Sequence, residues 1–265
     1  MIEDNIQLKL KERFNPEGSD LRLLQLRLLK ILKYIDSICS KHNIPYWLSS
    51  GTCLGAIRHG GFIPWDDDVD IEMLEKDYKR FEAIVGLKPD NGFVLQNSKN
   101  EPFYHFSYSK MRDLGEPVYE KNSIDENYIY KGAFVDIFTL SPSRSKKTHQ
   151  IAALLNLKLY HVINDKSKLK KWKYLLISSV IKTSYPFLKI IDSAFEKKVM
   201  RHSLGSWFFK SRLYSHLFPL QDFKFEDTSF PVPHNYDGYL KRIYGDYNKL
   251  PNLDNIKQHF SLRNS

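Results

Sequence analysis

Five acidic side chains fall within seven positions of a chain that is otherwise basic: Asp66, Asp67, Asp68, Asp70 and Glu72. They follow Trp65 directly, in a stretch whose aromatic and aliphatic residues belong in a core. Carboxylates this close repel one another, and those that share a site resist ionisation by up to several pKa units. A bound cation would relieve that repulsion, so the stretch predicts a cation site.

Asp68 and Asp70 are the expected ligands, because the run "DVDIEM" (68–73) reads as a β-strand. Residues two apart on a strand point to the same face, so the two carboxylates would project together. Oxygen-only ligands favour Mg²⁺, or Mn²⁺, over zinc. Asp66 and Asp67 are expected to orient the loop before the strand. A lone pair of this kind is more often a loop or a calcium site.

A third carboxylate is expected from Asp136, which stands between Val135 and Ile137 in the apolar run "GAFVDIFTL" (132–140). An unpaired acid in such a strand is costly. A neighbouring strand that brings Asp136 beside Asp68 and Asp70 would complete a three-carboxylate site for phosphoryl transfer. The alternative is an ion pair between Asp136 and an arginine.

A phosphate cradle is predicted upstream, where "SSGT" ends a strand and opens a helix. Backbone N–H groups at a helix N-terminus and the helix dipole hold phosphates, which makes Ser50, Gly51 and Thr52 candidate contacts. A Gly-Thr pair is weak by itself. The order of a glycine turn, an acidic strand and a later acidic strand favours a nucleotidyltransferase-type site.

Five further residues are candidate substrate contacts, each with a structural alternative. Arg58 and His59 would contact a diphosphate, or would serve as cations at a helix C-terminus. Trp65 would stack on a cytosine or a choline ammonium, or belong to the core. Lys110 and Arg112 alternate on one strand, which suits binding of the phosphates of a nucleotide-linked donor, although solvated strand charges look the same.

Helices and strands alternate irregularly along the first part of the chain, which predicts a mixed α+β (α/β mixed) fold. Helices are expected at 20–41, 52–59, 75–86 and 237–244, and strands at 44–51, 68–73, 92–97, 103–113 and 132–140. Residues 149–217 read as helical and basic. We therefore expect a catalytic core over 1–145, with a small mixed sheet flanked by helices. Residues 146–265 form a basic helical region and the C-terminal closure of the site, in one compact unit with the core; Tyr244 and Tyr247 are expected to close the site wall structurally.

Composition narrows the partners and the compartment. The 265 residues are 42% hydrophobic, which is enough for a core, and the net charge of +9 favours an anionic partner. No nucleic-acid recognition motif occurs, so nucleic acid is not expected. Cys39 and Cys53 form no CxxC pattern, which favours a reducing compartment. The N-terminus lacks a secretion signal and no apolar run reaches eighteen residues, so a cytoplasmic location is expected.

The segment 166–212 holds twelve Lys or Arg residues interleaved with "YLLISSVI", "YPFLKII" and "WFF". This mixture is typical of amphipathic helices at an anionic membrane surface. The charged face of an ordinary helical subdomain is the alternative.

The stretch "LSSGTCLGAIRHGGFIPWDDDVDIEMLEKDYKRF" closely resembles the signature of the LicD family, and "KMRD", "GAFVDIFTL" and "YLKRIYGDYNKLP" resemble later blocks of that family in the same order. The matches span roughly residues 45–251 and leave the middle helical segment uncovered. The resemblance implies a nucleotidyltransferase-like fold, distantly similar to fukutin-type proteins. By position, Asp68 and Asp70 match the metal-binding pair and Asp136 the third carboxylate. Ser50 stands where a glycine is commoner, and Thr139 where many relatives have proline, which puts the substrate's identity in question more than the activity.

The resemblance also implies transfer of phosphocholine from CDP-choline to a cell-surface glycan precursor: lipopolysaccharide, capsule or teichoic acid. We expect a metal-dependent transferase in which Asp136 deprotonates an acceptor hydroxyl. The expected acceptor is a glycan that is still attached to a lipid. The protein is accordingly expected to be peripheral on the inner face of the cell membrane. The alternatives are another CDP-linked donor (glycerol, ribitol or ethanolamine phosphate) and a non-catalytic scaffold that binds membrane or glycan.

Overall fold

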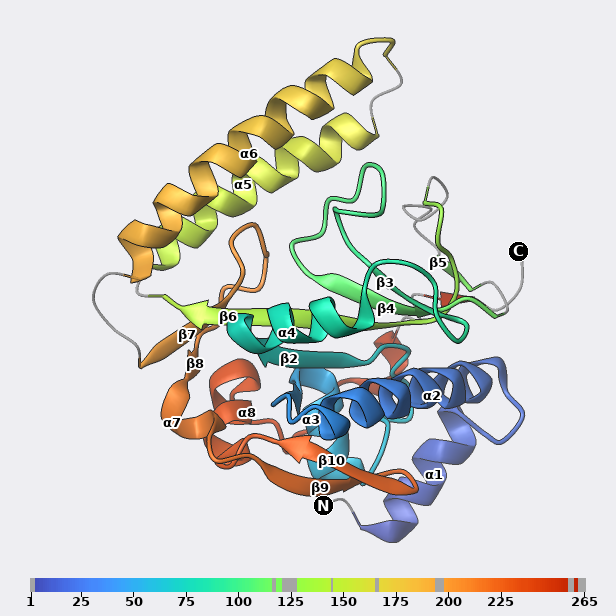
Figure 1. The fold of residues 1–265 in the computed structure, drawn as a ribbon. Coiled ribbons are helices and arrows are strands. Elements are labelled where there is room, and N and C mark those ends of the chain that lie inside the picture. Colours follow the sequence, from blue (N-terminus) through green and yellow to red (C-terminus); the bar gives the residue numbers. More distant parts are fainter. Residues whose placement is uncertain are drawn as a thin grey trace.

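The computed structural model describes residues 3–115, 118–120, 128–143, 145–164, 167–193, 198–256 and 260–261. A seven-stranded sheet lies at the centre, with the order β1-β2-β6-β4-β3, and β7 joins it by pairing with β6 and β8. Its strands are β1 (Trp47–Leu48), β2 (Asp70–Leu74), β3 (Phe93–Gln96), β4 (Ser109–Asp113), β6 (Phe134–Pro142), β7 (Val199–His202) and β8 (Arg212–Leu213). β2 and β6 run parallel, and the other pairs of this sheet are antiparallel. The predicted α+β class is confirmed (Figure 1).

The helices are α1 (Asp4–Phe14), α2 (Asp20–Lys41), α3 (Ser50–His59), α4 (Glu75–Val85), α5 (Lys146–Ile163), α6 (Lys170–Ser193), α7 (Tyr214–Leu217) and α8 (Tyr236–Tyr244). A short 3₁₀ helix follows at Leu253–Asn255. Two small antiparallel pairs complete the fold: β9 (Gln221–Phe225) with β10 (Thr228–Val232), and β5 (Tyr119–Glu120) with β11 (Phe260–Ser261).

Helix α2 follows its sequence pattern closely. The hydroxyl of Ser19 accepts a hydrogen bond from the backbone N–H of Arg22, which caps the helix, and α2 ends at Lys41 as predicted. Leu28, Ile31 and Ile35 recur at helical spacing and are almost fully buried. The helix therefore supplies one long apolar face to the core beneath the sheet.

The two faces of β6 have opposite character. Val135 and Ile137 are fully buried in the core cluster that includes α2. Asp136 and Phe138 alternate with them and point to the other face. That second face carries the aromatic contacts of Phe138 with Tyr108, His202 and Phe208. The polar side of the sheet is thus the side on which a site can form.

Strands β2 and β4 begin later than predicted. β2 begins at Asp70, so Asp68 lies in the loop before the strand, and the expectation of two carboxylates on one strand is wrong. The pairing with β6 begins at Asp70, and its first hydrogen bond is donated by the N–H of Asp136 to the carbonyl of Val69. β4 begins at Ser109, and the aromatic residues from Phe103 to Tyr108 form a loop.

The second half is less helical than expected. Within 149–217, β7 and β8 interrupt the helices, and β9 and β10 form a further hairpin beyond α7. β7 is only four residues long and exists because the end of β6 offers it a pairing edge. Its sequence, "VMRH", carries no periodicity of its own.

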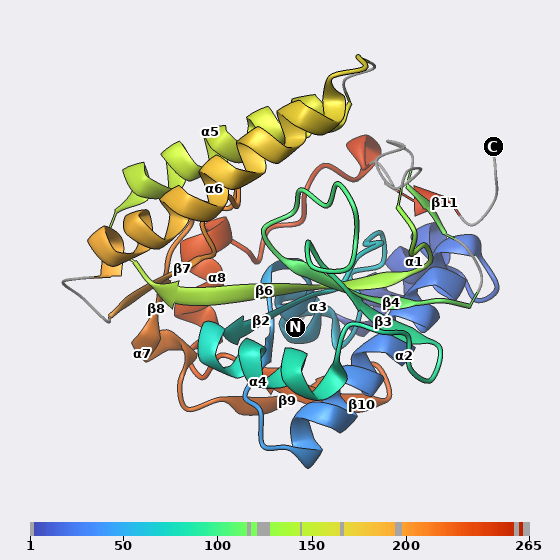
Figure 2. The same ribbon diagram turned by 45° about the horizontal axis from the view of Figure 1, so that its top comes forward.

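Helices α5 and α6 form a hairpin that lies side by side above the sheet in both views (Figures 1 and 2). No helix in the described part of the chain combines the length and the apolar character needed to cross a bilayer. Cys39 and Cys53 are both buried as free thiols.

Candidate active site

The parallel pairing of β2 with β6 brings two carboxylates together. Asp70 and Asp136 are direct partners in the register, so their side chains point to the same, polar face of the sheet. The N–H of Asp70 donates to the Thr52 hydroxyl (2.9 Å), and the N–H of Asp136 donates to the carbonyl of Val69 (2.9 Å). Backbone contacts therefore fix both residues, and neither can separate from the other without breaking the sheet.

Lys110, on the adjacent strand β4, is the register partner of Asp136, and the charge of Arg112 on the same strand also acts on Asp136. The Nζ atom of Lys110 lies 3.5 Å from Oδ1 of Asp136, beyond ordinary hydrogen-bond length. Oδ1 is buried and accepts no hydrogen bond from any residue that the structure describes. The ammonium of Lys110 also sits 3.2 Å from the ring centroid of Phe134 and 4.8 Å from that of Phe106. An aromatic cage thus positions this cation at the acidic centre.

The carboxylates raise one another's pKa values. Burial, followed by the charges of Asp68 and Asp136, raises the pKa of Asp70 well above its ordinary value. Burial and then Asp68 and Asp67 do the same for Asp66. For Asp136, burial outweighs the opposing effect of Lys110 and raises the pKa to about 6. These acids form one electrostatically coupled cluster that lacks enough positive charge.

The N-terminus of α3 stands against this cluster. Ser50 has a φ of +45°, a left-handed conformation that suits glycine, which explains why glycine is commoner at this position. A Cβ atom on Gly51 would lie 3.1 Å from Oδ2 of Asp66 and 3.9 Å from the hydroxyl of Tyr244. The backbone at Gly51 therefore approaches the acids closely. Its role as a phosphate contact stays a prediction.

Asp66, expected to orient the loop, and Tyr244, expected to close the site wall, both lie against the acids. Asp66 is held by its backbone: Gln25 of α2 donates to its carbonyl (2.9 Å) and is itself oriented by Asn15 (2.7 Å). Burial and then the charges of Asp70, Asp66 and Asp68 raise the pKa of Tyr244. Tyr244 lies more than a hundred residues beyond Asp136, and no local sequence signal links it to the acids.

Glu72, two residues after Asp70, is buried and fully compensated. Its Oε1 lies 2.7 Å from Nη2 of Arg212 and 2.7 Å from Nε2 of His202, and its Oε2 accepts from the indole of Trp47 (2.8 Å). Despite burial, Arg212 and His202 lower the pKa of Glu72 to about 2. This acid is a structural anchor rather than part of the cluster.

Arg58, His59 and Trp65 are placed in packing contacts at the end of α3. Arg58 is buried and donates to the carbonyl of Tyr247 (2.8 Å) and to Nε2 of His59 (2.9 Å). Burial and the charge of Arg58 lower the pKa of His59 to about 3, so its ring is neutral. Trp65 packs edge-on against Phe14 of α1, with ring centroids 5.3 Å apart. Arg58 nevertheless lies near enough to Asp66 to lower that residue's pKa.

Arg112 is enclosed in the sheet. Its guanidinium donates to Oε1 of Gln96 (2.5 Å) and to the carbonyl of Gly132 (2.8 Å). Of the two cations expected to meet phosphates, the structure brings Lys110 to the carboxylates and commits Arg112 to neighbouring strands.

Comparison with known proteins assigns this domain. Residues 43–139 match the family described as "LicD/FKTN/FKRP, nucleotidyltransferase domain". This stretch therefore carries a LicD-type nucleotidyltransferase domain. The matched range contains every residue predicted for the site, from Ser50 to Asp136, whereas Tyr244 lies outside it.

The proteins similar to this chain differ in how much they share with it. The lipopolysaccharide cholinephosphotransferase LicD of Haemophilus influenzae is 26% identical over 90% of this chain and 95% of that protein. The human ribitol 5-phosphate transferase FKRP is 31% identical over 35% of this chain, and human ribitol-5-phosphate transferase FKTN is 42% identical over 34%. The chain covers only 20% of each human protein. With those two, the likeness covers about a third of this chain.

Asp70→Asn should stabilise the cation-free protein at neutral pH, because it removes one of the carboxylates that repel one another. A carboxyl whose folded pKa exceeds its unfolded one destabilises the fold above the folded pKa, and that penalty disappears as the pH falls toward the unfolded value. We expect the free energy of unfolding in EDTA to rise by more than about 1 kcal/mol at pH 8 and to converge with wild type near pH 4. Urea titrations between these pH values measure it.

Asp222→Asn, on the exposed surface of β9, is the matched control and should leave the curve unchanged. A lower stability of Asp70→Asn at pH 8 would show that the carboxylate is a structural partner and not a member of a repulsive cluster.

Proposed function

We propose that this LicD-type transferase moves a phosphorylated small group from a CDP-linked donor onto a cell-surface glycan precursor, with phosphocholine from CDP-choline as the first candidate. The observation that carries the proposal is the pairing of Asp70 with Asp136, beside Lys110, inside the matched nucleotidyltransferase domain. The similarity to the Haemophilus influenzae protein extends over nearly the whole of both chains, which supports phosphocholine and lipopolysaccharide over other choices.

Asp136 is the proposed general base. The acceptor hydroxyl transfers its proton to Asp136 while its oxygen bonds to the β-phosphorus of the donor; the bond from that phosphorus to the bridging oxygen breaks, and CMP leaves. A base works best with a pKa near the working pH. In the cation-free protein burial raises the pKa of Asp136 to about 6, and a bound cation would lower it. Lys110 lies beside the reacting group and balances part of the phosphate charge.

The acids also suit a divalent cation in type, although they are not preassembled. Among the residues that the structure describes, no three His, Cys, Asp or Glu side chains are arranged to hold an ion. The orphaned Oδ1 of Asp136 and the mutual repulsion of the acids are what a cation would relieve. Asp68, Asp70 and Asp136 would hold Mg²⁺ or Mn²⁺. When bound, the ion would neutralise charge on the donor's phosphates.

Ribitol phosphate is the second candidate group, favoured by the likeness to human FKRP and FKTN in the domain that carries the acids. Glycerol and ethanolamine phosphate share the same chemistry. A non-catalytic scaffold is less well supported, because Asp68, Asp70 and Asp136 are all retained. Parallel transfer assays with CDP-choline, CDP-ribitol, CDP-glycerol and CDP-ethanolamine separate these choices.

Asp136→Asn tests the proposed base. A general base contributes about 10²- to 10⁴-fold, so kcat should fall by that order. The affinity for radiolabelled CDP-choline, measured by equilibrium dialysis, should change little, because the donor's diphosphate contacts other groups. Asp222→Asn is the control with unchanged kcat. Loss of donor binding together with catalysis would make Asp136 a ligand first, and the acceptor's proton would then need another destination.

We also propose that the protein is peripheral on the inner face of the cell membrane, held there by the α5–α6 hairpin. Residues 146–193 contain ten lysines and two aspartates, which is nearly the whole net charge of the chain. Anionic lipid headgroups attract such a segment.

The outer side of α6 adds an apolar stripe to this charge. Large apolar side chains recur every three or four residues and are between 44% and 72% exposed: Leu169, Trp172, Leu176, Val180, Phe187 and Ile190. Lys168, Lys171, Lys173 and Lys182 flank them in the sequence and are exposed too. A helix with this pattern lies in the plane of a membrane interface. Such docking would bring the site to acceptors that are still attached to lipid.

Replacing Lys168, Lys170, Lys171 and Lys173 with glutamine should weaken flotation with vesicles that contain 30% phosphatidylglycerol. Each basic residue near such a surface contributes about 1 kcal/mol. The matched control replaces Lys41, Lys76, Lys88 and Lys224, which are exposed elsewhere, and should float like wild type. Equal flotation of both variants, or no flotation of the wild type, would identify the hairpin as an ordinary helical subdomain.

A further inference from the structure

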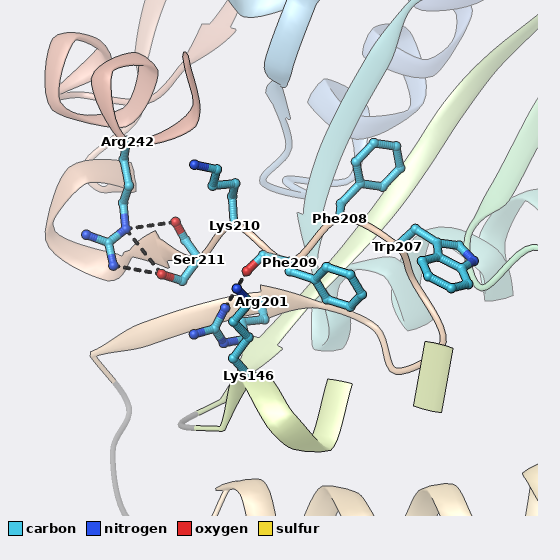
Figure 3. A pocket seen from close by; sticks show the side chains of 8 residues that line it. All are labelled: Lys146, Arg201, Trp207, Phe208, Phe209, Lys210, Ser211 and Arg242. Atoms are coloured by element: carbon cyan, nitrogen blue, oxygen red, sulfur yellow. Dashed lines mark hydrogen bonds between the residues drawn. The ribbon is translucent and has the colours of Figure 1, made fainter. Parts of the chain in front are cut away.

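A cavity of about 580 Å³ opens beside the acidic site, between α5, β7, the loop 203–211 and α8 (Figure 3). Half of its eight lining residues are cationic, and none is acidic. The cations come from four separate segments: Lys146 from the start of α5, Arg201 from β7, Lys210 from the loop and Arg242 from α8. Four cations from distant parts of the chain concentrate positive potential in one concave place.

Three of these four cations have no carboxylate as an ion-pair partner among the residues that the structure describes. Lys146, Lys210 and Arg242 form no ion pair with any acid in the described ranges. The two lysines are exposed at the cavity, so their ammonium groups remain available. An anion that enters the cavity would find charge that the protein itself does not neutralise.

The loop that forms the cavity wall is held in place. Arg201 donates to the carbonyl of Phe209 (2.6 Å), and Arg242 donates to the hydroxyl of Ser211 (2.7 Å) and to its carbonyl (2.9 Å). This anchoring leaves the rings of Trp207 and Phe208 about half exposed at the cavity. A rigid aromatic surface beside cations suits a ligand with both a ring and a negative charge.

The cavity adjoins the acids through two strands. Phe208 packs edge-on against Phe138, with centroids 5.3 Å apart, and against His202. Phe138 follows Asp136 by two residues on β6, and His202 is hydrogen-bonded to Glu72, which follows Asp70 by two residues on β2. Phe208 thus lies about two residues of strand, or about 7 Å, from Asp136. Arg201 is the register partner of Ser141, five residues and about 17 Å along β6 from Asp136. A group held by the cations would therefore lie about two or three sugar rings from the reacting hydroxyl.

We propose that this cavity is the acceptor subsite for an anionic group, a phosphate or a carboxylate, on the glycan that receives the transferred group, about two or three sugar units from the reacting hydroxyl. The inference rests on the proposed function and specifies its acceptor as an acidic or phosphorylated glycan. The same cations repel a quaternary ammonium, which directs choline elsewhere. The anion neutralises Lys146, Lys210 and Arg242, while the glycan extends along Trp207 and Phe208 toward Asp136.

Binding of glucose 6-phosphate to the full chain tests the subsite without any turnover. Trp207 reports the binding, and its share of the fluorescence is the difference between wild type and Trp207→Phe. We expect a saturable change with glucose 6-phosphate that weakens as salt increases, and none with glucose at the same concentration. Lys210→Gln/Arg242→Gln should weaken the affinity at least tenfold, while equilibrium dialysis shows binding of CDP-choline within twofold of wild type.

Lys224→Gln, an exposed lysine on β9, is the control and should bind glucose 6-phosphate like wild type. Because Arg242 also anchors Ser211, Lys146→Gln/Lys210→Gln provides a second test that leaves those hydrogen bonds intact. Equal responses to glucose and glucose 6-phosphate, or unchanged affinity in both double variants, would overturn the proposal, and so would a parallel loss of CDP-choline binding. If the sugar phosphate binds as expected but no CDP-linked donor supports transfer, the proposed function fails and the anion site stands.

Discussion

The repulsion between Asp70 and Asp136 is the constraint around which the site is built. Their parallel register places the two carboxylates side by side, and burial prevents water from screening them. The surrounding structure must hold them there. Fully buried apolar residues on the same strands, such as Ile71 and Val135, pack into the core and keep the strands together. Packing in the core thus holds together two strands whose carboxylates repel each other.

The charges that surround each acid determine whether it is a structural partner or is available for chemistry. Glu72 and Asp70 are two residues apart on one strand. Glu72 is fully buried and Asp70 is partly buried, yet their pKa values shift in opposite directions. Arg212 and His202 meet Glu72 at 2.7 Å, whereas Asp70 has acids as its nearest charges. The β7–β8 segment therefore anchors the end of β2 and leaves its beginning uncompensated. An excess of negative charge at that point is what a cation-dependent phosphoryl transferase requires.

Local patterns predicted much of the fold. Helix α2, the short helix at Gly51, and the apolar strand around Asp136 could all be recognised because each carries its own periodicity or cap. The start of β2 could not, since pairing with β6, not the alternation of Asp68 and Asp70, determines where the strand begins. The strands β7 to β10 depend on partners distant in sequence. The sequence predicts Asp66 in the loop and Tyr244 in the site wall, but not how closely they approach the other acids, because that depends on the packing of α2 and α8.

The central claim is that these acids are placed to hold a divalent cation, and thermal unfolding tests it most directly. A ligand that binds only the folded state raises Tm. Wild type should melt several degrees higher in millimolar MgCl₂ than in EDTA, and so should Asp222→Asn. Asp70→Asn should show no such rise, although its Tm in EDTA exceeds that of wild type. An equal rise in Asp70→Asn, or none in wild type, would contradict the account.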